Sequence, residues 1–199
     1  MSIDDSRFLN ADPFEIFNEW FIEAKNTEIN DPDAIALATV NKEGFPSVRM
    51  VLLKEYNKDG FIFYTNYNSR KANELLETQN ASFVIHWKSL RRQIRVVGKI
   101  EKVSSQKTST YFSSRGRGSQ IGAWASKQSQ ILKDRQTLID NAKSIDEKYP
   151  STVPTPPHWG GFRIIPFEIE FWIDGDNRLH DRFQYKLSNN NWICNRLYP

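Results

Sequence analysis

The segment Arg-Leu-His-Asp-Arg-Phe, residues 178–183, carries a basic side chain at every second position. In an extended strand, side chains alternate between the two faces, so Arg178, His180 and Arg182 are expected to share one face. Two guanidinium groups and an imidazole are poor material for a protein core, because buried charges are costly without partners. The row is therefore a candidate ligand-binding face, and the alternative is a set of three solvated strand residues.

A second candidate is Ser-Arg-Lys-Ala, residues 69–72, which opens a predicted helix directly after a predicted strand. The unpaired N–H groups and the dipole at a helix N-terminus attract anions. Arg70 and Lys71 lie in this first turn, which is unfavourable for cations in a helix that only stabilises itself. Beside backbone donors they suit a phosphate group. The alternative is two solvated basic residues after a serine cap.

Two further groups of polar residues are candidates for ligand contacts. On the predicted strand 46–56, Arg49 and Lys54 lie on opposite faces, which suggests that both ends of the strand meet something polar. A strand whose ends simply reach solvent explains them equally well. A possible second anion clamp lies where a predicted helix ends in a loop, and it comprises Tyr111, Arg115 and Ser119.

Composition excludes several classes of function. The chain has 199 residues, with 27 basic and 24 acidic side chains and a net charge of +3, too mild to indicate a nucleic-acid or membrane binder. Cys194 is the single cysteine, so neither an intrachain disulfide nor a cysteine zinc cluster is possible. The three histidines lack metal-ligand spacing, and no metal site is expected. With no signal peptide and no apolar run of membrane length, we expect a cytoplasmic protein.

Known catalytic motifs are missing from the sequence. It contains no nucleophile elbow with a Ser-His-Asp order, no recognisable pair of catalytic carboxylates and no P-loop. Any chemistry is therefore expected to come from a bound cofactor. The basic run 91–97 and the arm Ser-Ser-Arg-Gly-Arg-Gly-Ser also suggest an RNA-binding module, although the aromatic signature of such modules is missing.

The order of predicted elements indicates one domain over residues 1–199, mainly β with flanking helices (α+β). The sheet is expected to be antiparallel and to curl towards a barrel. An N-terminal helix is expected at about 12–28, and the barrel strands with their helices at 34–199. The expected strands are 34–40, 46–56, 61–66, 81–87, 91–103, 162–172, 178–187 and 192–198. Further helices are expected at 68–77, 104–117 and 129–148, the last with Ile131, Leu138 and Ile145 on one face.

Several of these segments occur together in one known family. The blocks RMVLLK (49–54), FYTN (63–66), SRKA (69–72), RQIRVVG (92–98), SQIGAWASKQS (119–129), WGGFR (159–163), EFW (170–172) and RLHDRF (178–183) follow one another along the chain. In this order the sequence resembles the pyridoxine (pyridoxamine) 5′-phosphate oxidase family from residue 12 to residue 199. The family's N-terminal Arg-x-x-Tyr element, which closes over the substrate, is matched only in part by Arg7-Phe8.

The resemblance implies an antiparallel FMN-binding split β-barrel that forms a homodimer with FMN at the subunit interface. It implies that FMN is held by Arg49, Met50, Val51, Leu52, Leu53, Lys54, Tyr64, Thr65, Arg70, Lys71, Gln93, Gln128, Ser129, Trp172 and Arg182. It implies a substrate site made of Lys54, Tyr111, Arg115, Ser119, Arg178 and His180, with the last two as catalytic residues beside the pyridine ring.

The implied reaction oxidises pyridoxine 5′-phosphate or pyridoxamine 5′-phosphate to pyridoxal 5′-phosphate. Oxygen is the final acceptor and leaves as H2O2, and the amine substrate also releases ammonia. On this reading the row 178–182 faces two stacked, phosphorylated flat molecules. Two alternatives remain open: a phenazine-pathway flavin oxidase of the same fold, and a carrier or sensor that binds FMN without turnover.

Overall fold

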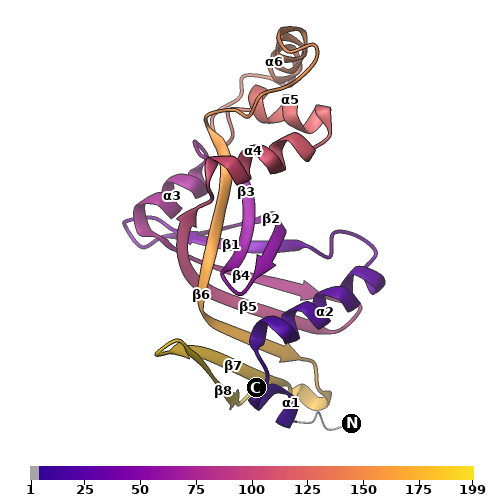
Figure 1. Ribbon diagram of the computed structural model, residues 1–199, viewed down its shortest axis with the longest axis vertical. Helices are drawn as coiled ribbons and strands as arrows, with labels where there is room; N and C mark the ends of the chain where they lie inside the picture. Colours follow the sequence, from indigo (N-terminus) through magenta and orange to yellow (C-terminus); the bar gives the residue numbers. More distant parts are fainter. Residues whose placement is uncertain (1–4) are drawn as a thin grey trace.

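The computed structural model describes residues 5–199, which form an elongated molecule (Figure 1). The helices are α1 (Asp5–Leu9), α2 (Pro13–Thr27), α3 (Arg70–Thr78), α4 (Ser105–Ser114), α5 (Arg117–Ala125) and α6 (Arg135–Lys148), with a short 3-10 helix η1 (Asp176–Arg178). The strands are β1 (Ala34–Val40), β2 (Pro46–Asn57), β3 (Gly60–Asn66), β4 (Asn80–Trp87), β5 (Arg92–Lys102), β6 (Trp159–Ile173), β7 (Asp181–Ser188) and β8 (Asn191–Leu197).

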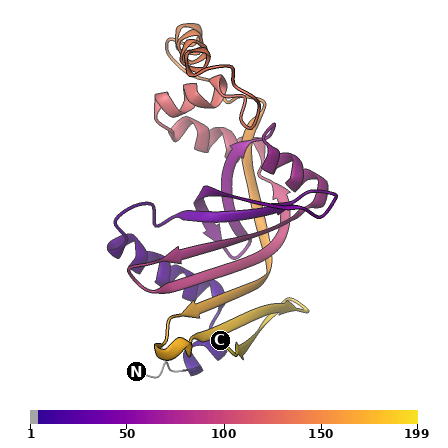
Figure 2. The same ribbon diagram turned by 180° about the vertical axis from the view of Figure 1, so that it is seen from behind.

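The strands form an antiparallel barrel with a two-strand extension. Their order is β3-β2-β1-β4-β5-β6-β7-β8, and an additional β3–β6 pairing closes the first six strands into the barrel. Strand β6 belongs to both the barrel and the extension, because one of its edges is divided between two partner strands. Its first part pairs with β3, from Trp159 to Ile164, and its last part pairs with β7, from Glu168 to Ile173. Figure 2 shows β6 running along the molecule from the barrel to this extension. The predicted antiparallel barrel with flanking helices is confirmed.

The core follows from the amphipathic pattern of α2. The Asp12 side chain accepts a hydrogen bond from the Phe14 amide, and Pro13 occupies the first turn, as predicted for the start of a helix. The helix then buries one aromatic and aliphatic face, in which Phe17 packs against Phe61 of β3 with ring centroids 5.0 Å apart. Fully burying a side chain of this kind stabilises the fold by roughly 1.5–3 kcal/mol.

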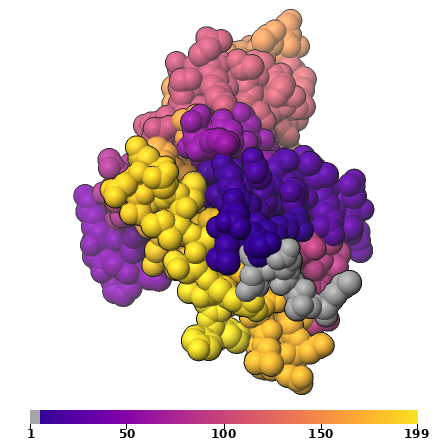
Figure 3. All heavy atoms as spheres, turned by 60° about the horizontal axis from the view of Figure 1, so that its bottom comes forward, coloured from indigo at the N-terminus to yellow at the C-terminus, as the bar shows by residue number. Residues whose placement is uncertain are grey.

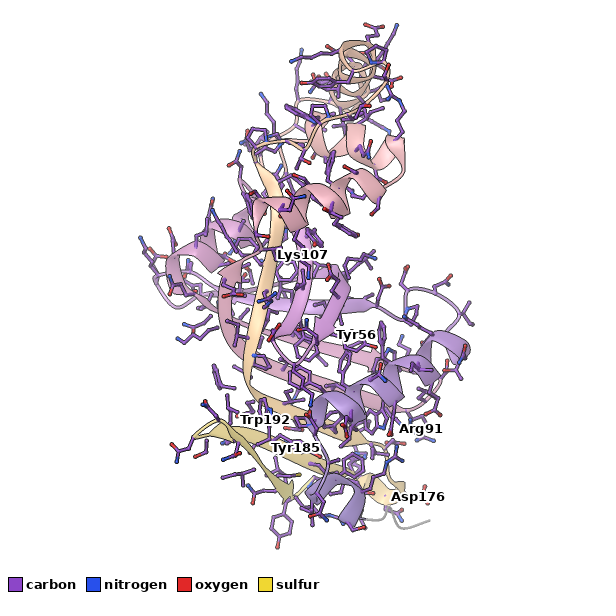
Figure 4. All side chains as sticks on the ribbon, viewed as in Figure 1. Tyr56, Arg91, Lys107, Asp176, Tyr185 and Trp192 are labelled. Atoms are coloured by element: carbon purple, nitrogen blue, oxygen red, sulfur yellow. The ribbon has the colours of Figure 1, made fainter. Side chains whose placement is uncertain are left out.

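The N-terminal segment also covers the C-terminal extension. Phe8 of α1 stacks on Phe183 of β7 at 4.1 Å, and its carbonyl accepts a hydrogen bond from the Tyr185 hydroxyl. Trp192 of β8 lies near Phe14, and Figure 4 shows Tyr185 and Trp192 between the extension and the first two helices. Helix α1 and the C-terminal strands consequently lie side by side on one surface (Figure 3). Phe8, which partly matches the family's closing element, is therefore a core residue here.

The helices after β5 differ from the prediction. The expected helix 104–117 is α4, which ends at Ser114 because Arg115 is extended, and a helix that was not predicted, α5, starts after the Gly116 cap. The expected helix 129–148 begins only at Arg135, where Asp134 accepts a hydrogen bond from the Thr137 amide at 2.7 Å. Ile131 therefore lies outside the helix and is fully exposed. Helix α6 buries none of its residues against the rest of the described chain.

The predicted strand 178–187 is also shorter than expected. Asp176–Arg178 form a 3-10 turn in which Asn177 and Arg178 have positive φ angles of 53° and 65°. Strand β7 begins at Asp181, so Arg182 is the one basic residue of the row that lies on it. The prediction that Arg178, His180 and Arg182 share a strand face is therefore wrong. The alternation of residue types does not reveal the left-handed turn that interrupts it.

No helix within residues 5–199 combines the length and the apolar character needed to span a membrane.

Candidate functional site

A cleft of about 1040 Å³ lies where the barrel meets α3, α4 and α5. Most of the residues expected to hold FMN line it, namely Arg49, Met50, Val51, Leu52, Lys54, Tyr64, Thr65, Arg70, Lys71, Gln128 and Ser129. So do Tyr111, Arg115 and Ser119 of the expected substrate site. In Figure 1 the three helices that border it, α3, α4 and α5, lie in the upper half of the molecule. Leu53 is the exception on β2, because it points inward and is 3% exposed.

Lys71 is the buried cation of the cleft. Its ammonium donates hydrogen bonds to Gln128 Oε1 at 2.8 Å, Thr65 Oγ1 at 3.1 Å and Ser69 Oγ at 3.2 Å. Burial, and then the positive charge of Arg49, lower the pKa of Lys71 to about 8. The ammonium thus joins β3, the start of α3 and the segment after α5 at one point.

The start of α3 is suited to an anion. Ser69 occupies the cap position, but its hydroxyl donates to the Asn66 carbonyl at 2.7 Å and forms no cap hydrogen bond. The N–H groups of the first turn have no partner within the helix itself. Arg70 and Lys71 of this turn both face the cleft. Backbone donors, a guanidinium and an ammonium therefore converge, as a phosphate requires.

A buried carboxylate that the sequence did not reveal as a site residue lies beneath these cations. Glu74 is 4% exposed, and its Oε1 accepts a hydrogen bond from Arg70 Nε at 2.8 Å. Its Oε2 accepts from Ser47 Oγ at 2.6 Å and from Thr39 Oγ1, and lies 3.4 Å from Arg49 Nη2. Burial opposes ionisation of Glu74, but the hydrogen bonds from Ser47, Thr39 and Arg70 outweigh it and lower the pKa to about 2. The carboxylate is therefore charged at neutral pH.

Flat aromatic rings form another wall. Tyr64 stacks on Tyr111 with centroids 4.0 Å apart and on Trp159 at 5.4 Å. Trp159, which sequence reasoning did not single out, also carries the Arg115 guanidinium 4.8 Å above its ring. Burial raises the pKa of the Tyr64 hydroxyl, and its interaction with Glu55 adds to this effect. The wall offers stacking surface to a planar molecule.

The surroundings of the Arg115 guanidinium indicate whether the cleft fits an anionic ligand. Its Nη1 is buried and has no hydrogen-bond partner among residues 5–199. Burial lowers the pKa of this guanidinium. Orphaned buried donors are uncommon and costly in folded proteins. Arg115 lines the cleft, so a phosphate bound there would meet its guanidinium, and the residues present fit a phosphorylated ligand. Lys54, also expected in this site, is paired with Asp33 at 2.7 Å.

The remaining predicted residues lie elsewhere in the chain. Gln93, Trp172 and Arg182 are direct neighbours across β5, β6 and β7, and the His180 ring packs on Trp172 at 4.6 Å. His180 Nδ1 accepts a hydrogen bond from the Gly175 amide at 3.1 Å, and Arg178 is exposed in the preceding turn. None of these five residues lines the cleft. We call them the C-terminal group; a single chain does not bring this group and the cleft together.

A second buried carboxylate holds Arg182 of the C-terminal group. Glu170 is 2% exposed, and its two oxygens accept hydrogen bonds from Arg182 Nε at 2.9 Å and Nη2 at 3.1 Å. Arg95 donates to the same carboxylate. Arg182 Nη1 also donates to the Tyr198 carbonyl at 2.9 Å, so this guanidinium is fixed on several sides.

Comparisons with known proteins agree with this geometry. Residues 21–149 match the family model described as pyridoxamine 5′-phosphate oxidase, and residues 159–199 match the pyridoxine 5′-phosphate oxidase C-terminal dimerisation region. A pyridoxine/pyridoxamine 5′-phosphate oxidase of Pelagibacter ubique is 51% identical over 191 residues, which cover 94% of this chain and 92% of that protein.

Two solved structures share the fold. PhzG from Burkholderia lata 383, in complex with tetrahydrophenazine-1-carboxylic acid, superposes with a TM-score of 0.93 at 29% identity, covering 100% of this chain and 98% of that one. A pyridoxamine 5′-phosphate oxidase-related, FMN-binding protein of Nostoc punctiforme superposes with a TM-score of 0.76 at 15% identity, covering 96% and 100%. With both family models and a relative of this identity matched along nearly all its length, the chain belongs to the pyridoxamine 5′-phosphate oxidase family.

Proposed function

We propose that this chain is an FMN-dependent oxidase that converts pyridoxine 5′-phosphate and pyridoxamine 5′-phosphate to pyridoxal 5′-phosphate. Oxygen is the final electron acceptor and is released as H2O2, and the amine substrate also yields ammonia. The enzyme acts as a homodimer in the cytoplasm. The observation that carries the proposal is a cleft with two anion-binding regions beside a wall of stacked aromatic rings. Two phosphorylated flat molecules need this combination.

The phosphate of FMN is assigned to the start of α3. Arg70 and the free N–H groups of the first turn donate hydrogen bonds there, and Lys71, whose three donors are used by Gln128, Thr65 and Ser69, adds its positive charge. Thr65, Gln128 and Ser129 complete this end of the cleft, and Gln128 holds the Lys71 ammonium in place. When bound, FMN supplies a two-electron acceptor that takes a hydride from the substrate carbon and is reoxidised by oxygen.

The substrate phosphate is assigned to the region around Arg115. The Arg115 guanidinium donates to it from the cleft wall, and Tyr111, Ser119 and Lys54 are the further ligands of the set. Arg115 and the phosphate are then both satisfied, and the stacked position of Arg115 over Trp159 fixes the direction of the contact. The chain thereby orients the substrate ring for reaction.

The C-terminal group completes the site from the second subunit of the dimer. Gln93, Trp172 and Arg182 contact the flavin, while Arg178 and His180 lie against the pyridine ring and act as the catalytic residues. This assignment explains why the group lies away from the cleft of its own chain, although the family resemblance places both in one site. FMN then lies at the subunit interface.

Anaerobic addition of pyridoxine 5′-phosphate to the purified, flavin-loaded protein tests the function. The expected result is loss of the oxidised-flavin absorbance, followed by its return and by H2O2 when air is admitted. Persistent absorbance with this substrate and with pyridoxamine 5′-phosphate would identify a carrier or sensor that does not turn over.

A phenazine-pathway oxidase is the second candidate, because the superposition on the Burkholderia lata PhzG covers the whole chain. That structure holds a carboxylic acid, whereas the substrate proposed here carries a phosphate. Comparing flavin reduction by pyridoxine 5′-phosphate and by pyridoxine separates the two functions. A phosphate-dependent reduction supports the first, and reduction only by a dihydrophenazine-type carboxylic acid supports the second.

A further inference from the structure

Glu74 is placed unusually for a residue that only stabilises the fold. A buried carboxylate paired with arginines is weak evidence for stability, since its desolvation offsets much of the attraction. The cations beside it repel one another. Burial is the main cause that lowers the pKa of Arg49, and the charge of Arg70 adds to it. Burial likewise lowers the pKa of Lys71, and the charge of Arg49 adds to it. A carboxylate that holds these cations together on one side of a cleft suggests a role in ligand binding.

The atoms that Glu74 contacts indicate this task. It binds Arg70 through Nε alone, and the two terminal nitrogens of Arg70 have no hydrogen bond to any other residue within the described part of the chain. The Arg70 side chain is 62% exposed, so without this contact it would sample many rotamers. Holding Nε restrains the guanidinium and leaves both terminal nitrogens available to a ligand in the cleft. Preorganisation of this kind raises affinity because less freedom is lost on binding.

Glu74 also reaches Arg49 through the β1–β2 pair. Thr39 and Ser47 are opposite each other in the sheet, and both hydroxyls donate to Glu74 while they accept from Arg49. The start of α3 is thereby tied to the strand whose outer residues line the cleft. The carboxylate itself is not among the residues that line the cleft.

We propose that Glu74 is a positioning residue for the phosphate end of the flavin site. It does not touch the ligand but fixes Arg70, and through Thr39 and Ser47 also Arg49, in the orientation that binds phosphate. The inference rests on the proposed FMN function. A contrary effect makes it testable: as a bare negative charge, Glu74 repels phosphate, so its neutralisation would tighten FMN binding. If Glu74 positions the arginines, its neutralisation weakens FMN binding instead.

The test is the affinity of apo-protein for FMN and for riboflavin, which lacks the phosphate, in Glu74→Gln. Loss of one well-oriented charge-assisted contact is expected to weaken FMN binding roughly tenfold or more, with riboflavin affinity changed by less than about twofold. Glu77→Gln is the matched control: Glu77 lies on the same helix and pairs at 3.7 Å with Lys42, away from the cleft. It should leave both affinities unchanged.

A double-mutant cycle with Arg70→Ala decides whether Glu74 acts through Arg70. The effect of Glu74→Gln on FMN affinity should largely vanish in the Arg70→Ala background. If Glu74→Gln does not fold, Glu74→Asp replaces it, since the shorter carboxylate keeps the charge but loses the reach to Nε. Unchanged or tighter FMN binding, equal losses for FMN and riboflavin, or additive effects in the cycle would each overturn the proposal. Failure of the unmodified protein to bind FMN would instead overturn the proposed function.

Discussion

The buried ammonium of Lys71 makes the phosphate site sensitive to pH. Its pKa of about 8 in the free protein means that the ammonium loses its proton as the pH rises above this value. A bound phosphate dianion favours the charged form, so binding takes up a proton in this range. FMN affinity is therefore expected to fall by up to about tenfold per pH unit above about pH 8. Fluorescence titration of apo-protein from pH 7 to 9.5 measures it, and Lys71→Met should remove most of this slope.

Stability of the apo-protein should show the opposite trend. The unfolded chain keeps the Lys71 proton up to the ordinary pKa of 10.5, whereas the folded chain keeps it only to about 8. The unfolded state therefore binds more protons between these values, and the contribution of Lys71 to stability rises with pH across the interval.

The FMN titration has its own contrary outcome. If the FMN affinity of the unmodified protein does not change over the same pH interval, Lys71 is not a phosphate ligand.

Arg178, His180 and Arg182 are expected to have separate duties. Arg182 is held by Glu170 and Tyr198, so Arg182→Ala should lose FMN and cost about 1.5–3 kcal/mol of stability, since Arg95 still pairs with Glu170. Arg178→Ala should keep its flavin and its dimer but lose most of its turnover, and His180→Ala should behave similarly but more mildly. Flavin content and single-turnover flavin reduction distinguish the three, and normal reduction in Arg178→Ala would contradict this division.

Sequence reasoning predicted these side chains unevenly, for physical reasons. The phosphate-binding character of Arg70 and Lys71 could be predicted because a helix start and two cations are adjacent in the sequence. The role of Glu74 could not, since its partners Thr39 and Ser47 come from strands far away in the sequence. Arg178 was misplaced because neither the residue types nor their spacing indicate its positive φ.

Among the strands, the β5–β6 pairing depends on a glycine. The register shifts between Val97 and Gly98, and a Cβ at position 98 would lie 2.4 Å from the Ile165 carbonyl oxygen. Gly98→Ala is therefore expected to cost about 1–3 kcal/mol, because backbone atoms cannot move aside as a side chain can. Gly118→Ala on α5 is the control, with open space around the position and a better helix former in place. Urea unfolding should show a lower midpoint for the first variant and an equal or higher one for the second.

The helices and strands that formed where expected carry strong local signals. The cap and the aromatic face of α2 lie within the same short segment, so its prediction needed no tertiary information. The division between α4 and α5 depends on the backbone at Arg115 and Gly116, and the late start of α6 on the cap at Asp134. Closure of the barrel by β3 and β6 joins residues about one hundred positions apart, which periodicity does not reveal.

For the molecule as a whole, the separation of cleft and C-terminal group predicts complementation between subunits. Arg70→Ala damages the first part of each site and Arg182→Ala the second. If every site takes one part from each subunit, a mixed dimer of the two variants has one intact site and one doubly damaged site. Co-expression with two different tags should therefore raise bound FMN and activity above the level that either variant shows alone. Mixed dimers without flavin would show that each site is built within one chain.

The division of the β6 edge between β3 and β7 also bears on how the protein unfolds. A strand that is hydrogen-bonded to both structures cannot leave one without disturbing the other, and α1 and α2 add contacts across the same boundary. The barrel and the C-terminal extension therefore melt together as one cooperative unit, with the amides of β6 among the slowest to exchange with solvent. Helix α6, which buries none of its residues against the described chain, lies outside this unit and opens first.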